Sequence, residues 1–413
     1  MNNSFLKRTL SMSVFAFLLA GTVTAQTSRP RRVRQPQKPA EEPLLRPQPT
    51  TSSTARTNPN APLLEVQPVR PVVNNVATGD TTHAYQLLQQ KQYAAAAKEA
   101  REIAAQFPTD AEAWKIAGFA ELYLKQYAEA GSALEKALEL QRAAKQEDPK
   151  TVDALGQAYV LSEKFDRALP LLVSATKRSG VPPDPLLLYY RGLAEYKSGK
   201  PLDAERTFNA VIKLNPKDPL PLFYLGQIAL GKNDLAGAIS VLNRATVNDP
   251  RLAAGWTLLT SAYLRRAALS EDPAKAEEDY LNAVRAGEGL IKVKTDAESI
   301  TMFGQALIGA KQYPRAAVVL ERATTSANAS GVTFYLLGVA YSRANSFPKA
   351  IVALQTAATK SPDDVNVYRE LGYAYEVTKQ YAKALAAYEK GLSLAPGDTD
   401  FKEAAERIRP FAK

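Results

Sequence analysis

The chain has 413 residues and a formal net charge of +10, with 52 Lys and Arg residues against 42 Asp and Glu residues. It contains no cysteine, which excludes disulfides, thiolate metal sites, cysteine nucleophiles and an N-terminal cysteine lipid. A single histidine, His83, leaves little for metal binding or acid–base catalysis, so we expect no metal and no cofactor.

Residues 1–25 have the layout of a secretory signal peptide. Lys7 and Arg8 precede an apolar run from Val14 to Ala20, and small residues lead to a cleavage site after Ala25. The apolar run is short for a membrane span, although an uncleaved signal anchor is the alternative. We therefore predict an exported bacterial protein that is periplasmic or associated with the outer envelope, with secretion also open.

Residues 26–79 form a segment rich in proline and arginine, which we expect to be a disordered, extended tether. Its eight basic residues against three glutamates give +5 (8 − 3). We expect the arginine cluster in 29–34 to make weak contact with an anionic envelope surface, or only to keep the tether extended. The Pro-x-x-Pro spacings from Pro36 to Pro39 and from Pro68 to Pro71 resemble ligands of aromatic grooves, but arise easily in such a segment.

Little of the positive charge belongs to the rest of the chain. The tether and the two basic residues of the leader carry +7, so +3 (10 − 7) remains after residue 79. Nucleic-acid binding needs a basic stripe on a folded surface. We therefore expect no nucleic-acid partner.

A period of 34 residues runs through the remaining chain. It separates Gly192 from Gly226, and it carries Gly304 to Gly338 and Gly372. Such a period indicates a helical-repeat array, which buries its core between neighbouring units and leaves a long surface for binding. The alanines that follow the same step are Ala204 and Ala238, then Ala316, Ala350 and Ala384.

One unit shows that each repeat is a pair of helices. Apolar residues recur every three or four positions in 222–229 and again in 235–245, as in amphipathic helices. Residues 231–233 signal a turn, and Pro250 marks the exit from the second helix. Glycine and alanine recur where two helices approach closely, because neither residue has a bulky side chain.

The unit resembles the tetratricopeptide repeat, whose pattern is W-x-x-L-G-x-x-Y, then A-x-x-x-F, then P. The last unit carries this pattern from Tyr368 through Gly372 and Ala384 to Pro396. The resemblance implies an all-α fold: a right-handed superhelical solenoid of about nine hairpins over residues 80–396, with a capping helix over 397–413. The glycines that match the pattern are Gly118, Gly156, Gly192, Gly226, Gly304, Gly338 and Gly372.

Two units and both ends depart from the pattern. The second helix of the unit at Trp114 continues past Arg142. The unit at Trp256 has Thr260 in place of glycine and extensions around 270–273 and 286–296, which we interpret as longer helices or loops. They are either partner-specific features or neutral length variation. The first unit is degenerate, as expected for a cap, and the last helix has one apolar stripe, formed by Phe401, Ala404, Ala405 and Ile408.

In the family, first helices of successive hairpins line a concave surface, and the resemblance implies that two positions four residues apart in each unit face it. These pairs are Lys115 with Phe119, Asp153 with Gln157, Tyr189 with Leu193, Phe223 with Gln227, Thr257 with Ser261, Thr301 with Gln305, Tyr335 with Val339, and Arg369 with Tyr373. The surface is aromatic and amide, without the lysine and asparagine clamp by which some members bind chaperones. It predicts a partly apolar segment or helix of a partner protein, although packing of the aromatics as core is the alternative. The candidate binding residues are Phe119, Gln157, Tyr189, Leu193, Phe223, Gln227, Gln305, Tyr335 and Tyr373.

No pattern supports catalysis. There is no nucleophile paired with a base, no phosphate-binding glycine loop and no His or Cys cluster, and the adjacent carboxylates of 277–279 indicate a solvated helix face. We therefore predict a non-enzymatic scaffold of the bacterial cell envelope that binds partner proteins through the concave surface. The alternative is an envelope-polymer or membrane-surface protein whose basic tether supplies the affinity and whose repeats oligomerise. Salt separates the two, because binding by charge weakens with ionic strength.

Overall fold

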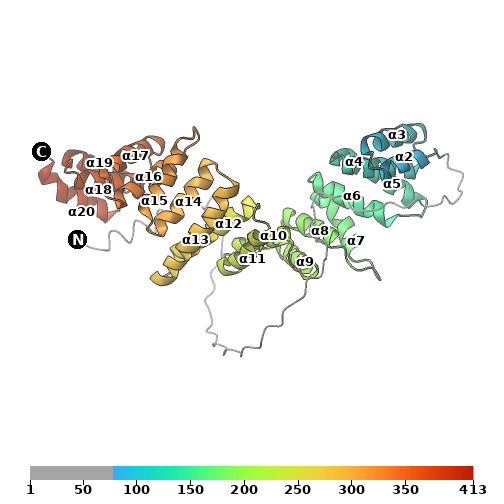
Figure 1. Ribbon diagram of the computed structural model, residues 1–413, viewed down its shortest axis with the longest axis horizontal. Helices are drawn as coiled ribbons and strands as arrows, with labels where there is room; N and C mark the ends of the chain where they lie inside the picture. The colour runs from blue at the N-terminus through green and yellow to red at the C-terminus, as the bar shows by residue number, and fades with distance from the viewer. Residues whose placement is uncertain (1–77, 413) are drawn as a thin grey trace, which may run out of the picture. The chain divides into compact units, whose positions relative to one another are not determined.

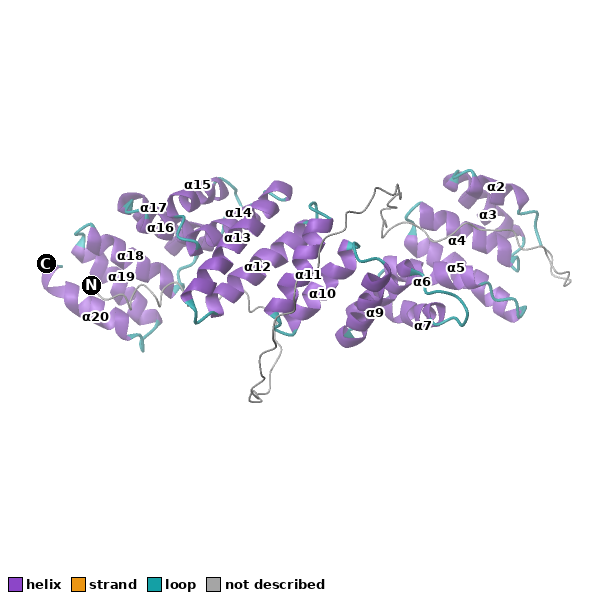
Figure 2. Cartoon of the chain, turned by 60° about the horizontal axis from the view of Figure 1, so that its bottom comes forward, coloured by secondary structure: helices purple, strands orange, loops and turns teal. Residues whose placement is uncertain are grey.

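The computed structural model describes residues 78–412, and these form 19 α-helices, α2 to α20, followed by a short 3-10 helix. This part of the chain contains no strand (Figure 2). The helices pair into nine hairpins and one final helix: α2 (Thr82–Gln89) with α3 (Tyr93–Gln106), α4 (Ala111–Tyr123) with α5 (Tyr127–Ala143), α6 (Pro149–Leu161) with α7 (Phe165–Thr176), α8 (Pro185–Lys197) with α9 (Pro201–Leu214), α10 (Pro219–Gly231) with α11 (Leu235–Asn248), α12 (Ala253–Leu269) with α13 (Pro273–Val293), α14 (Ala297–Gly309) with α15 (Tyr313–Thr324), α16 (Gly331–Arg343) with α17 (Phe347–Lys360), α18 (Val365–Val377) with α19 (Tyr381–Leu394), then α20 (Thr399–Ile408).

Each hairpin packs against the next one along the chain (Figure 1). The second helix of one hairpin contacts the first helix of the following hairpin, and several first helices also contact one another directly. The core therefore lies between consecutive hairpins, as in a solenoid. The predicted all-α solenoid of about nine hairpins is confirmed.

Aspartates fix where the first helices begin. In α4, α6, α8, α10, α14, α18 and α20 the residue before the helix is an aspartate whose carboxylate accepts a hydrogen bond from a first-turn backbone N–H. Such a cap stabilises a helix by about 1 kcal/mol. In α16 the same role falls to Ser330, whereas α12 has no side-chain cap.

A left-handed residue fixes the turn between the two helices of most hairpins. These residues have φ between 58° and 73°, and one of them is Asn233, in the turn predicted at 231–233. The only glycine among them is Gly199. The other residues accept the small strain that a side chain causes at positive φ, because the turn requires this conformation. The others are Lys91, Lys125, Glu163, Lys311, Asn345 and Lys379.

The seven pattern glycines lie where the helices of one hairpin are closest. A Cβ added at any of them would lie only 2.4–2.9 Å from a side-chain atom sixteen residues later, in the second helix. Real Cβ atoms do not come so close, so each position requires glycine at the observed helix spacing. The facing side chains are Leu134, Leu172, Phe208, Leu242, Leu320, Leu354 and Tyr388. The repeating alanines, Ala204, Ala238, Ala316, Ala350 and Ala384, are completely buried.

The hairpin of α12 and α13 is built differently. Its helices have 17 and 21 residues. Of the two predicted extensions, 286–296 is mostly a prolongation of α13, whereas 270–272 form the loop between the two helices. Thr260 is buried and donates its hydroxyl hydrogen bond to the carbonyl oxygen of Trp256. The close approaches move to α13, where Cβ atoms at Gly287 and Gly289 would lie 2.6 Å from Phe303 and 2.7 Å from Trp256.

The helices at both ends of the array are short, with 8 residues in α2 and 10 in α20. The last helix, α20, buries Phe401, Ala404, Ala405 and Ile408, as predicted for a cap. None of the helices in 78–412 is long and apolar enough to cross a bilayer. The predicted signal peptide and nearly all of the predicted tether lie outside the described residues.

Candidate binding surface on the first helices

We call the first member of each implied pair the junction position: Lys115, Asp153, Tyr189, Phe223, Thr257, Thr301, Tyr335 and Arg369. In several hairpins its side chain contacts the start of the next first helix. The Nζ atom of Lys115 lies 3.3 Å from Oδ2 of Asp148, which caps α6, and Arg369 pairs with Asp398, which caps α20. The hydroxyl of Thr301 lies 2.9 Å from that of Thr333 in α16. These side chains connect neighbouring repeats and are not directed at a partner.

Asp153 makes a related contact with the loop that precedes α8. The guanidinium of Arg178 donates to both carboxylate oxygens of Asp153, with Nη1 2.8 Å from Oδ2. Burial raises the pKa of Asp153, and Arg178 opposes that shift without cancelling it. The charge at this junction position is therefore also used within the array.

Burial separates the nine candidate binding residues into two sets. Phe119, Gln157, Tyr189 and Tyr335 are buried, with exposed fractions of 0–6 %. Gln157, for example, donates its amide hydrogen bond to the hydroxyl of Tyr190 at 3.3 Å. These four side chains pack within the array. The half-buried set, which keeps surface for a partner, is Leu193, Phe223, Gln227, Gln305 and Tyr373.

A cluster of six aromatic rings joins α8, α9 and α10. Tyr224 lies at its centre, with its ring centroid 5.3 Å from both Phe208 and Phe223 and 5.5 Å from Tyr196. Tyr189 lies 6.3 Å from both Phe208 and Tyr224, and 5.7 Å from Tyr190. Each such ring pair adds about 0.5–1.5 kcal/mol beyond the area it buries. The cluster therefore holds the fourth and fifth hairpins together.

Six residues of α8 and α10 beside this cluster keep part of their surface exposed, and we call them the α8–α10 stripe: Leu193, Tyr196, Leu220, Phe223, Tyr224 and Gln227. All six are half-buried. Within each helix they are three or four positions apart, so they share one face, and the Tyr196–Tyr224 contact brings the two faces together. Burial raises the pKa of both tyrosines above 10.0, so the stripe carries no charge near neutral pH.

Three members of the stripe, Tyr196, Leu220 and Tyr224, were not among the sequence-based candidates. Leu220 and Tyr224 are three or four positions from Phe223 and Gln227, and this helical spacing could have revealed them. Tyr196 could be placed only from the structure, because its role follows from contact with a helix in another hairpin.

Near the C-terminus, ion pairs join consecutive first helices, from α16 to α18 and from α18 to the start of α20. Arg343 in α16 donates to both carboxylate oxygens of Glu370 in α18, at 3.0 and 2.8 Å. The exposed fractions of these side chains are 12 % and 4 %. The buried Nε atoms of Arg343 and Arg369 make no hydrogen bond. Of the candidates here, Tyr373 remains half-buried, with its ring centroid 6.2 Å from that of Phe347.

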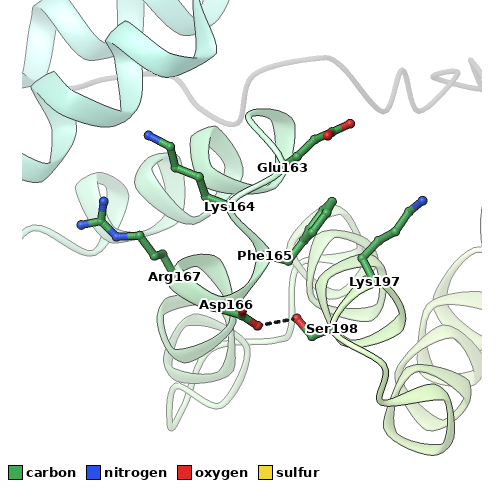
Figure 3. A pocket seen from close by; sticks show the side chains of 7 residues that line it. All are labelled: Glu163, Lys164, Phe165, Asp166, Arg167, Lys197 and Ser198. Atoms are coloured by element: carbon green, nitrogen blue, oxygen red, sulfur yellow. Dashed lines mark hydrogen bonds between the residues drawn. The ribbon is translucent and has the colours of Figure 1, made fainter.

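A small hollow lies between the turn before α7 and the end of α8 (Figure 3). It has a volume of about 280 Å³, and its lining includes Lys164, Arg167 and Lys197. Figure 3 shows that these charged ends fan out and do not converge, while Ser198 donates to Asp166 at 3.0 Å across the hollow. Arg167 is paired with Glu135. The hollow thus lacks a convergent set of groups for a ligand.

No group of three or more His, Cys, Asp or Glu side chains in 78–412 is arranged to hold a metal ion. The carboxylates of 277–279 were predicted to form a solvated face. Glu277 and Glu278 are exposed, but Asp279 is buried and pairs with Arg266. The role of Asp279 is therefore to join α12 to α13.

Comparisons with known proteins agree with the repeat pattern. The family model described as "Tetratricopeptide repeat" matches residues 154–219, 191–253 and 335–399. A comparison with curated proteins found no match.

Similar solved structures are tetratricopeptide repeat proteins. One from Parabacteroides merdae is 13 % identical, covers 63 % of this chain and 98 % of its own, and has a TM-score of 0.40. The C-terminal part of a repeat-containing protein from Cytophaga hutchinsonii is 15 % identical, covering 79 % and 99 % with a TM-score of 0.39. YrrB, described as having an unusual peptide-binding site, is 18 % identical, covering 48 % and 97 % with a TM-score of 0.39.

The nine hairpins, the glycine contacts that recur within them and the three matches of the family model agree. Arrays of this kind are scaffolds for protein interaction. The chain contains tetratricopeptide repeats, which the family model matches over residues 154–253 and 335–399.

Proposed function

We propose that this protein is a non-enzymatic scaffold of the bacterial cell envelope and that it binds a segment of a partner protein along the α8–α10 stripe. The observation that carries the proposal is the group of half-buried rings in which Tyr224 contacts both Phe223 and Tyr196. Contiguous partly exposed rings on a repeat array are typical of an interaction site.

The composition of the stripe favours a partly apolar partner segment. The rings and Leu193 and Leu220 offer apolar area, and the amide of Gln227 can both donate to and accept from a peptide backbone. Because none of the six side chains is charged, binding there should depend little on ionic strength.

The envelope location is supported by the N-terminal sequence. Residues 1–25 carry the basic, apolar and small-residue regions of a signal peptide. The mass of the mature N-terminus tests this part of the proposal: a product that begins at Gln26 supports it, and one that retains Met1 opposes cleavage.

Affinity capture from the native envelope fraction tests the binding proposal. The wild-type chain is compared with Phe223→Ala and with a control, Val352→Ala, whose side chain is 64 % exposed on α17. A third variant replaces Arg29, Arg31, Arg32 and Arg34 by serine, and each capture is repeated at low and high salt.

We expect a partner that persists at high salt and in the arginine variant, is unaffected by Val352→Ala, and binds at least tenfold more weakly to Phe223→Ala, as for loss of an aromatic anchor. Capture that fails at high salt and in the arginine variant would instead support binding through the basic tether.

A further inference from the structure

We propose that residues 62–73 of the same chain dock on the α8–α10 stripe and occupy it until a partner displaces them. The docking concerns the chain alone, and only the displacement rests on the proposed function. The named occupant follows from the composition of the segment, the chemistry of the stripe and the point where the chain enters the array.

Apolar residues are concentrated in this part of the predicted tether. Of the twelve residues in 62–73, three are proline, two are leucine and four are valine. In 26–56, by contrast, the only leucines and valine are Leu44, Leu45 and Val33. Residues 62–73 also contain the spacing from Pro68 to Pro71, which the proposed function leaves unused.

The stripe has the chemistry that such a segment requires. A proline-rich chain favours an extended conformation without internal hydrogen bonds, so its carbonyl groups remain available. It binds surfaces where aromatic side chains pack against proline rings and a polar donor reaches the backbone. Tyr196, Phe223 and Tyr224 supply the rings, and Gln227 lies on the same face of α10 as a donor.

The entry point of the chain places the segment within reach. The backbone N–H of Gly79 donates to Oδ2 of Asp110 at 2.9 Å, which ties the chain to the start of α4. From Pro71 to Gly79 there are eight residue steps (79 − 71), which span roughly 26 Å when extended. α4 contacts α6, and α6 contacts α8, so α8 is two helix spacings away, roughly 20 Å. Pro71 can therefore reach the start of α8. Tyr196 lies eleven residues further along that helix (196 − 185), roughly 17 Å, so the residues nearer Pro62 are the ones that can reach the stripe.

Covalent attachment favours this occupant over a second copy. A short flexible connection holds a tethered segment at an effective concentration in the millimolar range, far above that of another molecule in dilute solution. Even weak docking would then keep the stripe covered.

Disulfide trapping in the full chain tests the docking, and the absence of native cysteine makes it specific. The test chain carries Val66→Cys with Leu220→Cys on the stripe. The matched control carries Val66→Cys with Val247→Cys, whose position on α11 is 74 % exposed. Mild oxidation is followed in dilute protein by gel shift and mass spectrometry.

We expect an intramolecular disulfide in the test chain at least about tenfold faster than in the control, since docking raises the local concentration. Phe223→Ala added to the test chain should slow it toward the control. Equal rates in the two chains would overturn the proposal, and so would a product that is mainly an intermolecular dimer.

A second measurement uses no added cysteine. In full chains with Leu63→Ser, Leu64→Ser and Val66→Ser, capture of a stripe-dependent partner should tighten several-fold because the competing segment is lost. Unchanged or weaker capture would oppose the displacement. If trapping succeeds but capture never depends on Phe223, docking stands and the proposed function fails; if capture depends on Phe223 but trapping rates are equal, only this inference fails.

Discussion

The junction between α8 and α10 and the junctions from α16 to α20 use the same framework in different ways. Both have a glycine facing a bulky side chain, at Gly226 and at Gly338, with an added Cβ 2.5 Å from leucine in each case. Near the C-terminus, however, Arg343 and Arg369 join neighbouring repeats through ion pairs, whereas α8 and α10 meet through aromatic rings.

This difference shows how one repeat yields two kinds of surface. The ion pair of Arg343 and Glu370 directs its charged groups at each other within the array. A ring cluster buries some rings and leaves the edges of others exposed, as for Phe223 and Tyr224. The backbone thus supplies a common spacing, and the residue at each junction determines whether that position closes the array or offers a binding surface.

The largest effect should come from breaking a charged junction. Arg343→Met leaves the carboxylate of Glu370 buried without its partner, and we expect a loss of about 3–5 kcal/mol in local stability. Arg343→Met with Glu370→Leu should recover most of it, because no charge is left behind. Hydrogen exchange in α16 and α18 measures both variants, since a repeat array need not unfold in one step. A double variant as unstable as the single one would contradict the explanation.

At the aromatic junction, loss of a buried ring should cost more stability than loss of a half-buried ring. Tyr189→Ala removes a ring that is 6 % exposed and should cost about 3 kcal/mol in the exchange stability of α8 and α10. Phe223→Ala removes a half-buried ring and should cost about 1 kcal/mol. If Phe223→Ala were as destabilising as Tyr189→Ala, Phe223 would belong to the core, not to a binding surface.

Replacing a pattern glycine by valine should cost the same stability in both regions. Gly226→Val and Gly338→Val each place carbon atoms against a buried leucine, and we expect a loss of about 2 kcal/mol for each. The matched control is Gly231→Val, where an added Cβ meets nothing within 4 Å, and its effect should stay below about 0.5 kcal/mol. Thermal melting of all three variants compares them, and equal melting would oppose a packing role for the pattern glycine.

The smallest effect concerns the charge at Asp153. Because its pKa in the folded chain is raised above 3.8, folded protein binds this proton more tightly than unfolded protein does. The stability contributed by the residue is therefore complete below about pH 3.8 and is lost as the pH rises through the folded-state pKa. Asp153→Asn should gain stability relative to the wild type between about pH 4 and pH 7, as measured by urea unfolding at each pH. A relative loss would show that the ion pair with Arg178 dominates.

Much of the framework could be predicted from sequence because it depends on local spacing. Glycine and alanine recur every 34 residues, and apolar residues every three or four, which was enough to predict the hairpins, the close helix approaches and the final apolar stripe of α20. The aspartates that cap most first helices could also be predicted, because each is a polar residue just before a helical pattern.

The junction contacts could not be predicted in this way. Lys115 meets an aspartate 33 residues later, and Arg369 meets one 29 residues later, so both pairs depend on how consecutive repeats stack. For the same reason, Phe119, Gln157, Tyr189 and Tyr335 matched surface positions of the pattern but are buried. Contact across hairpins, not spacing within a helix, determined which rings kept an exposed edge.

Hydrogen exchange of the chain with Leu63→Ser, Leu64→Ser and Val66→Ser, in which residues 62–73 no longer cover the stripe, tests the central claim most directly when it is measured with and without the captured partner. The account predicts that partner binding slows exchange in α8 and α10, with little change in α16 and α18, where ion pairs close the junctions. Protection centred on α16 to α20, or absent from residues 185–231, would contradict the assignment of the α8–α10 stripe as the binding surface.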